Sequence, residues 1–521
     1  MAALDEPTGA TSAAPGARGS GALVLVGFMG AGKSTVARVL GAELSVEVLD
    51  SDREVERELG EPIEAFFDRE GEAAFRSREE QVALRLLADS HPRVIALGGG
   101  TLGSERVREA LHDHLVVHLE VEPEDAWRRA SNRGRPLARD PGRFEQLHRD
   151  RVPLYESIAQ VALPPGDRNL PRRALAAIEA LREAPAGTRL VWASAASGEY
   201  PVFFGRGLLA AGFFQPEGRR RFVVSDTNVA RHHRVSGQAA IEIPPGESEK
   251  TLARAEQVLR ELARAGATRA DLVVAVGGGV VGDLAGFCAA VYQRGMRHVQ
   301  VPTTLVAQVD SAFGGKTGVD LPEGKNYVGA YHQPASAIVD PDTLATLPAA
   351  EAAAGYVELV KTALIAGGRL WAHVRAGGEP DDEAILGCLR TKLRVVAEDE
   401  RDEGRRQVLN LGHTVGHAIE AATGYSRYRH GEAVGLGLLC ALRLSGRETL
   451  RKEVAALFGD RGLPLRLDGV SADDVLALIG RDKKRVGERV PFVLVDAPGE
   501  VTPGHEVGDE QLRLAVEEIA A

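Results

Sequence analysis

A glycine-rich segment near the N-terminus has the residue spacing of a phosphate-binding loop. Gly27 to Ser34 fits the pattern G-x-x-x-x-G-K-[ST], between an apolar run that predicts a strand over 23–27 and a segment that predicts a helix from Thr35. In this setting backbone N–H groups wrap around nucleotide phosphates, Lys33 reaches the outer phosphates, and Ser34 ligates magnesium. A glycine-rich turn before a helix is the alternative, although every motif position is present. The segment predicts a nucleoside triphosphate site without naming the phosphate acceptor.

Charged residues and glycines follow at positions where open parallel sheets bind ligands. A predicted strand brings Asp50 and Asp52 to its C-terminal end. Their carboxylates could hold a metal-bound water or take up a hydroxyl proton. Arg76 lies just inside a predicted helix, and another strand ends in Gly98–Gly100, where the backbone can approach a ligand closely. These features predict an acceptor site beside the phosphate loop.

Each of these features also has a structural explanation. Ser51 or Asp52 could cap a helix N-terminus, and three glycines could form a tight turn. The basic loop RASNRGRPLARD suits a lid that closes over phosphates, but it could equally be a solvated charged loop.

A candidate metal site lies far along the chain. NLGHTVGHAIEA places His413 and His417 four residues apart on one face of a predicted helix. RHGEA supplies His430, and AAGYVELVK supplies Glu358, with Lys361 one helical turn beyond. Three nitrogen or oxygen ligands with an open fourth position are typical of catalytic zinc. Two histidines at this spacing can also lie on a surface or in a core without binding a metal. Sequence spacing alone does not show that these residues are close in space.

A second glycine-rich turn, in AVGGGVVGDLAGF, follows a predicted strand and opens a predicted helix. A pyrophosphate could sit on the backbone amides of 277–282, although the spacing is not that of G-x-G-x-x-G. Polar residues in nearby glycine-rich loops suggest an anionic ligand, although such loops could be solvent-exposed connections. These residues are Thr303, Thr304, Asp310, Lys316, Lys325 and Asn326.

The surrounding elements predict two α/β regions and a helical one. Strands expected at 23–27, 46–49, 94–97 and 115–119 alternate with amphipathic helices, which indicates a parallel sheet covered on both faces. Strands and helices alternate again over 189–340, and the pattern beyond Asp340 is almost entirely helical. We therefore expect a tail over 1–20 and domains over 21–184, 185–340 and 341–521, with the seam near 184–188 and a ligand cleft between the last two.

Bulk properties exclude several classes of protein. The 521 residues are 44% hydrophobic and carry a net charge of −11, which argues against a broad nucleic-acid footprint. Cys288, Cys388 and Cys440 are isolated, which fits a reducing compartment. Apolar stretches fall short of the ~18 residues that span a bilayer, and the N-terminus lacks the apolar core of a signal peptide. We expect a cytoplasmic, multidomain enzyme that binds neither membrane nor nucleic acid.

The first half resembles the shikimate kinases. The resemblance is carried by GFMGAGKST, the D-x-D of Asp50 and Asp52, GE..FR at 71–76, the glycine triplet, the lid RGRPL at 133–137, and R.PLY at 151–155. It implies ATP-dependent phosphorylation of the shikimate 3-hydroxyl. It also assigns ATP and magnesium to Gly30, Ala31, Gly32, Lys33, Ser34 (the Mg ligand), Thr35 and Arg135, and shikimate to Asp52, Arg76, Gly99 and Arg151. A gluconate-kinase-like or adenylate-kinase-like enzyme is the rival, because a phosphate loop alone serves both.

The stretch from about 189 to 500 resembles the 3-dehydroquinate synthases. GGGVVGDLAGF, VQVPTTL.AQVDS, GGKTGV, GKN, LN.GHT.GHAIE and HGEAV stand in the family's order. The resemblance implies NAD, a divalent metal (zinc, with cobalt possible), 3-deoxy-D-arabino-heptulosonate 7-phosphate as substrate, and a homodimer in which Arg294 reaches the neighbouring subunit's substrate. The implied metal ligands are Glu358, His413 and His430, with His417 beside them as a catalytic residue.

The same resemblance implies two further residue sets. The NAD contacts are Asp226, Glu247, Lys250, Gly279, Val280, Val281, Gly282, Asp283, Thr303, Thr304, Lys325, Thr343, Leu344, Ala345 and Thr346. The substrate contacts are Asp310, Lys316, Asn326, Lys361, Lys392, Arg406, Asn410, Arg294, and Lys483 or Lys484, with Lys316 and Lys361 also catalytic. Lys316 and Asn326 would orient the phosphate, and Lys392 and Arg406 the carboxylate.

We therefore predict a bifunctional shikimate-pathway enzyme with a kinase half and a synthase half. In one alternative, one half is catalytically inactive. In others, the second half is a glycerol-type metal alcohol dehydrogenase or a sugar-phosphate cyclase that produces inosose or valiolone. Lys392 and Arg406 favour a carboxylate substrate over these rivals.

Overall fold

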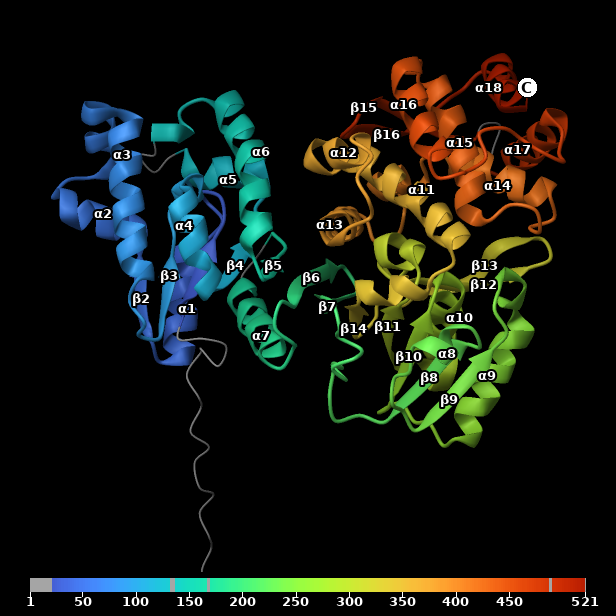
Figure 1. The fold of residues 1–521 in the computed structure, drawn as a ribbon, viewed down its shortest axis with the longest axis horizontal. Helices are drawn as coiled ribbons and strands as arrows, with labels where there is room; N and C mark the ends of the chain where they lie inside the picture. Colours follow the sequence, from blue (N-terminus) through green and yellow to red (C-terminus); the bar gives the residue numbers. More distant parts are fainter. Residues whose placement is uncertain (1–20, 132–135, 166–168, 487–489, 521) are drawn as a thin grey trace, which may run out of the picture. The chain divides into compact units, whose positions relative to one another are not determined.

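Figure 1 shows the computed structural model, which describes residues 21–131, 136–165, 169–486 and 490–520, with the backbone alone for 481–486. The chain forms two compact units, the first ending at Trp192 and the second beginning at Ala193. Among the described residues, no helix has the length and apolar character needed to cross a membrane.

The first unit contains parallel strands in the order β2-β3-β1-β4-β5, and β5 pairs with β6, a strand that crosses the boundary between the two units. These strands are β1 (Leu23–Val26), β2 (Glu47–Asp50), β3 (Arg93–Ala96), β4 (Leu115–Leu119), β5 (Val161–Leu163) and β6 (Arg189–Ala195). The four strands predicted at 23–27, 46–49, 94–97 and 115–119 are confirmed to within one residue at either end. Every residue of β1 is buried, as expected for a central strand between layers of helices.

Helices connect the strands of this sheet and cover it (Figure 1). They are α1 (Lys33–Leu44), α2 (Ser51–Leu59), α3 (Ile63–Leu87), α4 (Glu105–Ala110), α5 (Pro123–Ala130), α6 (Pro141–Ile158) and α7 (Leu170–Arg182). Because β1, β2 and β3 are parallel, their carboxyl ends meet at one edge. The phosphate loop, the Asp50–Asp52 segment and the glycine triplet therefore lie together there.

The second unit opens with another parallel sheet, in the order β7-β14-β11-β10-β8-β9. Its strands are β7 (Gly198–Phe204), β8 (Arg221–Asp226), β9 (Ala239–Ile243), β10 (Leu272–Gly277), β11 (Arg297–Pro302) and β14 (Ser336–Val339). Helices α8 (Val229–His232), α9 (Leu252–Arg264) and α10 (Gly279–Val291) accompany it, and β12 (Lys316–Leu321) and β13 (Gly324–Tyr331) form a hairpin against α10.

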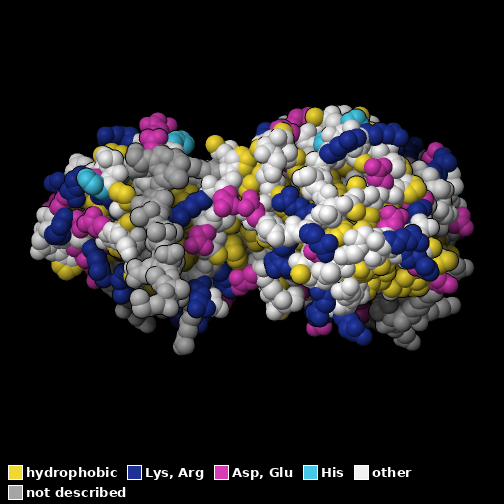
Figure 2. All heavy atoms as spheres, turned by 90° about the horizontal axis from the view of Figure 1, so that it is seen from below, with side chains coloured by type: hydrophobic (Ala, Val, Ile, Leu, Met, Phe, Trp, Pro, Cys, Tyr) yellow, Lys and Arg dark blue, Asp and Glu magenta, His cyan; other side chains and the backbone are white. Residues whose placement is uncertain are grey.

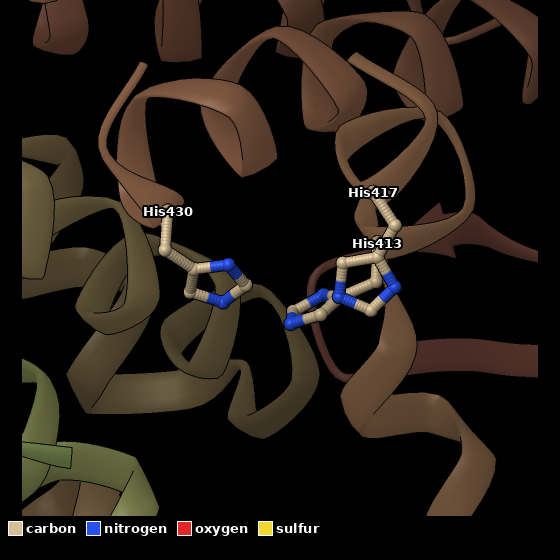
Figure 3. A group of neighbouring side chains, drawn as sticks. All are labelled: His413, His417 and His430. Atoms are coloured by element: carbon tan, nitrogen blue, oxygen red, sulfur yellow. The ribbon is translucent and has the colours of Figure 1, made fainter. Parts of the chain in front are cut away.

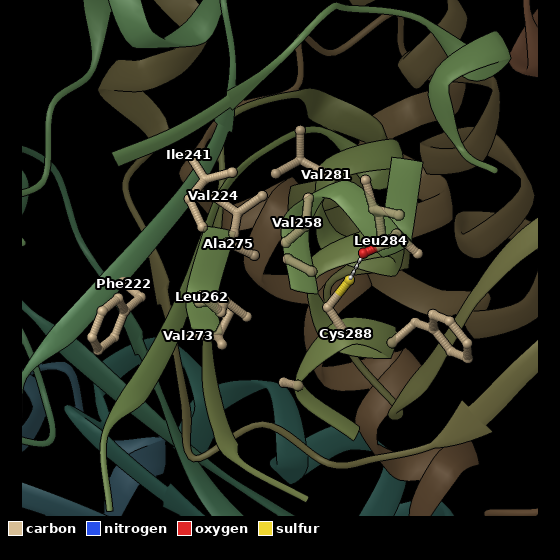
Figure 4. Close-up of a cluster of buried hydrophobic side chains, with 14 of the residues drawn as sticks. Phe222, Val224, Ile241, Val258, Leu262, Val273, Ala275, Val281, Leu284 and Cys288 are labelled. Carbon is tan, nitrogen blue, oxygen red and sulfur yellow. Dashed lines mark hydrogen bonds between the residues drawn. The ribbon is translucent and has the colours of Figure 1, made fainter. Parts of the chain in front are cut away.

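The core of this sheet region is apolar and closely packed. Val224 and Ala275 from the strands meet Val258, Leu262 and Leu284 from α9 and α10, all buried (Figure 4). Apolar faces of this kind fix the helices on the sheet, and so they hold the glycine turn between β10 and α10 in place.

The rest of the second unit is mainly helical. Its helices are α11 (Ala349–Ala366), α12 (Gly368–Arg375), α13 (Asp382–Glu398), α14 (His413–Ala422), α15 (His430–Leu444), α16 (Glu448–Gly459), α17 (Ala472–Val486) and α18 (Asp509–Ala520). The sequence pattern did not reveal an antiparallel hairpin near the C-terminus, β15 (Phe492–Ala497) and β16 (Glu500–His505), which packs on α15. Its alternating FVLVDA and the tight Pro498–Gly499 turn are the signal that could have revealed it.

The surface carries side chains of both charges. On the face shown in Figure 2, basic and acidic side chains are interspersed rather than gathered into one broad patch.

Candidate active sites

The phosphate loop of the first unit is shaped by glycines in the left-handed backbone region. Gly30 and Gly32 have φ of 86° and 95°, and α1 begins directly afterwards at Lys33. The Lys33 ammonium donates to the carbonyl oxygens of Gly27 (2.8 Å) and Phe28 (3.1 Å) and so spans the loop. Ser34 and Thr35 lie exposed in the first turn of α1, as the motif predicts.

The acceptor side forms where β2 and β3 end. Ser51 Oγ accepts a hydrogen bond from the Gly98 amide at 2.8 Å, which joins the two strand ends. A methyl group at Gly98 would lie 2.5 Å from Asp52 Oδ1, so Asp52 packs directly on the glycine triplet. The cap of α2 is neither Ser51 nor Asp52. Asp50 accepts from the amides of Asp52 (3.1 Å) and Arg53 (3.4 Å), because its extended backbone directs its carboxylate at them.

Arg76 reaches this edge because α3 is kinked. Gly71, with φ of 82°, interrupts the helix, so Arg76 lies just inside the second segment. Its guanidinium donates to Glu79 (2.6 Å) and Glu72 (3.1 Å) and touches the position that a side chain at Gly100 would occupy. Although burial opposes the shift, Glu79 raises the pKa of Arg76, which keeps a positive charge at the site.

A second guanidinium also contacts the triplet. Arg151 Nη1 donates to the Gly99 carbonyl oxygen at 3.0 Å, and the buried Tyr155 hydroxyl donates to the same oxygen at 2.5 Å. Burial lowers the pKa of Arg151. Asp52, Arg76, Gly99 and Arg151 therefore converge, whereas Arg135 lies outside the described residues.

A cavity of about 1230 Å³ in the second unit contains the other candidate site. Its lining runs from the end of β8 past the β10–α10 turn to α14 and α15. Most of the predicted dinucleotide contacts line it: Asp226, Glu247, Lys250, Gly279, Val280, Val281, Asp283, Thr303, Thr304, Lys325 and Thr346. Gly282, Thr343, Leu344 and Ala345 do not. The Gly282 amide instead bonds to the Gly278 carbonyl oxygen inside the first turn of α10.

Neighbouring side chains pack closely on the glycines of the β10–α10 turn. A methyl group at Gly278 would lie 2.9 Å from Thr304, and one at Gly279 would lie 3.1 Å from Ser311 Oγ. The Thr303 hydroxyl is buried without a hydrogen-bond partner. An unpaired buried hydroxyl beside a helix N-terminus is the environment that a phosphate group satisfies.

Three histidines meet at the helical side of the cavity (Figure 3). Ligand atoms of His413, His417 and His430 lie within 4.8 Å of one another. Glu358 Oε1, on α11, lies 3.8 Å from His413 Nε2 and 3.7 Å from His430 Nε2. The Glu358 side chain is 1% exposed, and Oε1 has no hydrogen-bond partner. A buried carboxylate oxygen facing two imidazole nitrogens suits a cation between them.

The ionisation of the three rings differs: although burial opposes the shift, Glu420 and Glu358 raise the pKa of His430, whereas the pKa values of the other two rings are lowered. Burial, and then the charge of Lys361, lowers the pKa of His413 well below its usual value. Burial and the neighbouring His430 lower the pKa of His417 to about 4. Neutral imidazole is the form that binds metals, so these two rings are ready to act as ligands near pH 7.

Close helix packing brings these ligands together. A methyl group at Gly416 on α14 would lie 3.0 Å from the Val434 backbone, and one at Gly437 on α15 would overlap the Gly412 carbonyl oxygen. The glycines therefore let α14 and α15 approach until the first turns of both helices, with His413 and His430, face each other. His413 Nδ1 also lies 3.2 Å from the Leu411 carbonyl oxygen, which orients the ring.

Two lysines and one aspartate lie beside this cluster. Asp310, in a short π-helical turn over Ala307–Ser311, pairs with Lys361 at 3.3 Å and with Lys392, whose ammonium also donates to the Asp310 carbonyl oxygen at 2.7 Å. Although burial opposes the shift, Lys361 and Lys392 lower the pKa of Asp310 well below its usual value. Burial lowers the pKa of Lys392. The buried charges thus compensate one another.

The remaining predicted substrate contacts lie in different surroundings. Asp310, Lys316, Asn326, Lys392, Arg406 and Asn410 line the cavity. Arg406 is buried and donates to the carbonyl oxygens of Glu400 (2.5 Å) and Gly314 (3.0 Å). Arg294 is exposed and is not among the lining residues. Lys483 and Lys484 belong to α17, but their side chains lie outside what the structure describes.

Sequence reasoning missed two carboxylates in this cavity region. Asp402 pairs with Lys316, and Glu420, one helical turn beyond His417, lies between His430 and Lys325. Burial opposes the shift, but His430 and Lys325 lower the pKa of Glu420 to about 2. The position of Glu420 in GHAIEA, on the face of the helix near His417, was the available signal.

Comparison with known proteins agrees with these geometries. Residues 240–354 match the N-terminal part of 3-dehydroquinate synthase and residues 355–485 its C-terminal part. The 3-dehydroquinate synthase of Symbiobacterium thermophilum is 40% identical over 348 residues, which cover 61% of this chain and 97% of the relative. The chain belongs to the 3-dehydroquinate synthase family. The enzyme of Rhodopseudomonas palustris is 42% identical over 57% of this chain and 86% of the relative.

The first unit matches a second family. Residues 29–181 match shikimate kinase. The chain therefore joins a shikimate kinase domain to a 3-dehydroquinate synthase and carries both shikimate-pathway activities. This confirms the predicted fusion and resolves the choice against a gluconate- or adenylate-kinase-like first half.

Solved structures of related cyclases share the fold of the synthase. A 2-deoxy-scyllo-inosose synthase, complexed with carbaglucose-6-phosphate, NAD+ and Co2+, is 25% identical over 63% of this chain and 99% of its own, with a TM-score of 0.56. The 2-epi-5-epi-valiolone synthase of Streptomyces hygroscopicus, with NAD+ and Zn2+ bound, is 25% identical over 61% of this chain and 96% of its own, with a TM-score of 0.55.

Proposed function

We propose that the synthase half acts on 3-deoxy-D-arabino-heptulosonate 7-phosphate with NAD and a divalent metal held by Glu358, His413 and His430. The main support is the buried Glu358 Oε1, which has no hydrogen-bond partner and lies within 3.8 Å of the Nε2 atoms of His413 and His430. This donor set fits zinc or cobalt, and His417 would stand beside the open position. The relatives solved with NAD+ and Co2+ or Zn2+ support the same pair of cofactors.

The dinucleotide fits the glycine turn and the unpaired Thr303 hydroxyl. Gly278 and Gly279 would let its pyrophosphate approach the N-terminus of α10. Lys250 is buried and pairs with Asp283 at 2.7 Å and Glu247 at 3.8 Å, which fixes the carboxylates at the cavity wall. When bound, the dinucleotide supplies reversible hydride transfer and the metal supplies Lewis-acid polarisation.

The carboxylate and the phosphate of the substrate would bind at two different ends of the site. Lys392 and Arg406 would bind the carboxylate, and Lys316 and Asn326 the phosphate. Asp310 would hold Lys361 and Lys392 beside the reacting carbons, because it pairs with both. Lys361, buried between Asp310 and Glu358 (2.5 Å), is placed to hold or move a proton there. His417 would serve as a further proton carrier.

In the kinase half, Lys33 and Ser34 would hold the phosphates and magnesium of ATP. Asp52 would contact the reacting hydroxyl of shikimate, while Arg76 and Arg151 bind its carboxylate. The convergence of both guanidiniums on the glycine triplet supports this assignment, since planar paired donors match a carboxylate. Arg135 would contact ATP from the lid.

Three further expectations complete the proposal: the oligomeric state, the location in the cell and the domain limits. A homodimer would form through the synthase half, with Arg294 reaching the partner's substrate. The exposed Gln293 and Arg294 hold φ of 48° and 66°, a costly backbone for residues other than glycine, and this supports a functional role. The pathway and the buried free cysteines support a cytoplasmic location. We retain 21–184, 185–340 and 341–521 as the domain limits.

Separate variants of the intact chain test the two halves. Lys33→Met should abolish ATP-dependent shikimate phosphorylation and leave 3-dehydroquinate formation at the parent rate. His413→Ala should do the reverse. Loss of both activities in either variant would contradict independent sites, and parent-level turnover in either would remove that residue's assignment. A stoichiometric rise of NADH during turnover would favour a dehydrogenase over the cyclase.

A further inference from the structure

A buried carboxylate joins the histidine cluster to the hairpin on the dinucleotide side of the cavity. Glu420, on α14, has a side chain that is 2% exposed. Its Oε1 accepts a hydrogen bond from Lys325 Nζ at 2.9 Å and lies 3.3 Å from His430 Nδ1. One oxygen therefore contacts both a residue of β13 and the first residue of α15.

This contact determines which nitrogen of His430 is available to a metal. A carboxylate oxygen accepts but does not donate, so the hydrogen bond requires the proton on Nδ1. Nε2 then carries the lone pair, and Nε2 is the atom that lies 3.7 Å from Glu358 Oε1. A partner that accepts a hydrogen bond from the ring nitrogen that does not bind the metal fixes the tautomer and the orientation of a histidine ligand.

Lys325 in turn holds Glu420 in place. The Lys325 side chain is 17% exposed and also pairs with Glu247 at 3.2 Å. A carboxylate as buried as Glu420 is costly without a counter-charge, and the ammonium supplies it. The chain of contacts thus runs from Glu247 through Lys325 and Glu420 to His430.

We propose that Glu420 is a positioning residue for the metal site and that Lys325 acts on that site through Glu420. The proposal rests on the metal function proposed for Glu358, His413 and His430. It gives Lys325 a role in metal binding that is separate from any contact with the dinucleotide.

The test is a metal titration of the full chain, stripped of metal and dinucleotide. Zn2+ affinity is measured against a competing chelator for the parent, Glu420→Gln, Lys325→Met and the double variant. Removal of a partner behind a histidine ligand typically weakens metal binding about 10- to 100-fold, which we expect for Glu420→Gln. Lys325→Met should weaken binding several-fold alone and have no further effect in the Glu420→Gln background. Glu351→Gln, which changes a carboxylate paired with Arg429 at the cavity wall, is the matched control and should bind like the parent.

Further readouts separate positioning from damage to the fold. Shikimate phosphorylation by the same molecules and their unfolding temperature report the amount of folded chain. The visible absorption of bound Co2+ should change in Glu420→Gln, because the ring of His430 is less constrained. If Glu420→Gln does not fold, Lys325→Met alone decides.

Failure of the proposed metal site and failure of the positioning roles give different results. A parent chain that binds no Zn2+ removes the proposed metal site itself. A parent that binds Zn2+ while either single variant binds equally well overturns the positioning roles. Additive losses in the double variant overturn the claim that Lys325 acts through Glu420.

Discussion

Glu358 Oε1 and His413 Nε2 lie 3.8 Å apart although they belong to different helices, α11 and α14. Neither helix could place a cation alone, so the site depends on how closely three helices pack. That dependence makes the site sensitive to small changes at the α14–α15 contact.

Gly437→Ala tests this dependence. The added methyl group would overlap the Gly412 carbonyl oxygen and push α15 away from α14. Overpacking of this kind costs ~1–3 kcal/mol, so we expect lower stability of the synthase unit and weaker Zn2+ binding. Gly435→Ala, on the same helix, meets its nearest atom at 3.4 Å and should behave like the parent. Zinc titration and thermal unfolding measure both, and equal behaviour of the two variants would contradict the packing account.

Gly100→Ala should impair shikimate binding by the kinase unit. A methyl group there overlaps the guanidinium of Arg76, which must move away from the glycine triplet. We expect a rise in KM for shikimate of at least about tenfold, with a smaller change in KM for ATP. Gly103→Ala meets no atom within 4 Å and is the control. Steady-state kinetics with both substrates varied would reveal an unchanged shikimate KM, which would separate Arg76 from substrate binding.

Asp399 is expected to position Arg406 for the synthase substrate. Its Oδ2 accepts hydrogen bonds from the amides of Gly404 (2.8 Å) and Arg406 (3.0 Å), and its Oδ1 from that of Glu403 (3.1 Å). Asp399→Ala removes these contacts, so the loop loosens and KM for the heptulosonate phosphate should rise roughly tenfold while Zn2+ affinity stays constant. Glu403→Gln keeps the loop's amides paired and should leave KM unaltered. A fall in Zn2+ affinity in Asp399→Ala would instead indicate a general disturbance.

His298 should make the synthase unit sensitive to acid. Its ring is buried, stacks on His332 with centroids 5.0 Å apart, and leaves Nδ1 without a partner. Burial, and then His332, lowers its pKa from 6.5 to about 3. The unfolded chain therefore binds a proton below pH ~6.5 that the folded chain does not bind until about pH 3. Stability falls across that window by up to ~1.4 kcal/mol per pH unit.

The variant His298→Leu removes this titration. Unfolding free energies measured from pH 7 to pH 4 should fall less steeply in the variant than in the parent. Parallel curves would show that His298 carries no net proton uptake on unfolding.

The elements around both sites could be predicted because local signals agreed with one another. Glycine turns, short apolar strands and amphipathic helices identified the four kinase strands and the β10–α10 turn, and parallel strands bring their carboxyl ends to one edge. The paired His413 and His417 were likewise visible from helical spacing.

Other features depend on contacts between distant segments, which spacing does not encode. Glu420 becomes meaningful only when Lys325 and His430 are beside it, and Asp402 only when Lys316 is. Capping of α2 by Ser51 or Asp52 was an open alternative because several neighbouring residues can cap a helix, and the extended backbone of Asp50 makes Asp50 the cap instead. The β15–β16 hairpin is short and lies among helices, so the helical pattern concealed it.

The most direct test of the account is selective removal of the transition metal from the purified, intact chain. After treatment with a chelator that spares magnesium, 3-dehydroquinate formation from the heptulosonate phosphate should fall to background and return on addition of Zn2+ or Co2+. Shikimate phosphorylation with MgATP, assayed in the same samples, should stay at its starting rate throughout. Persistent 3-dehydroquinate formation in chain shown to be free of metal would contradict the metal centre at Glu358, His413 and His430.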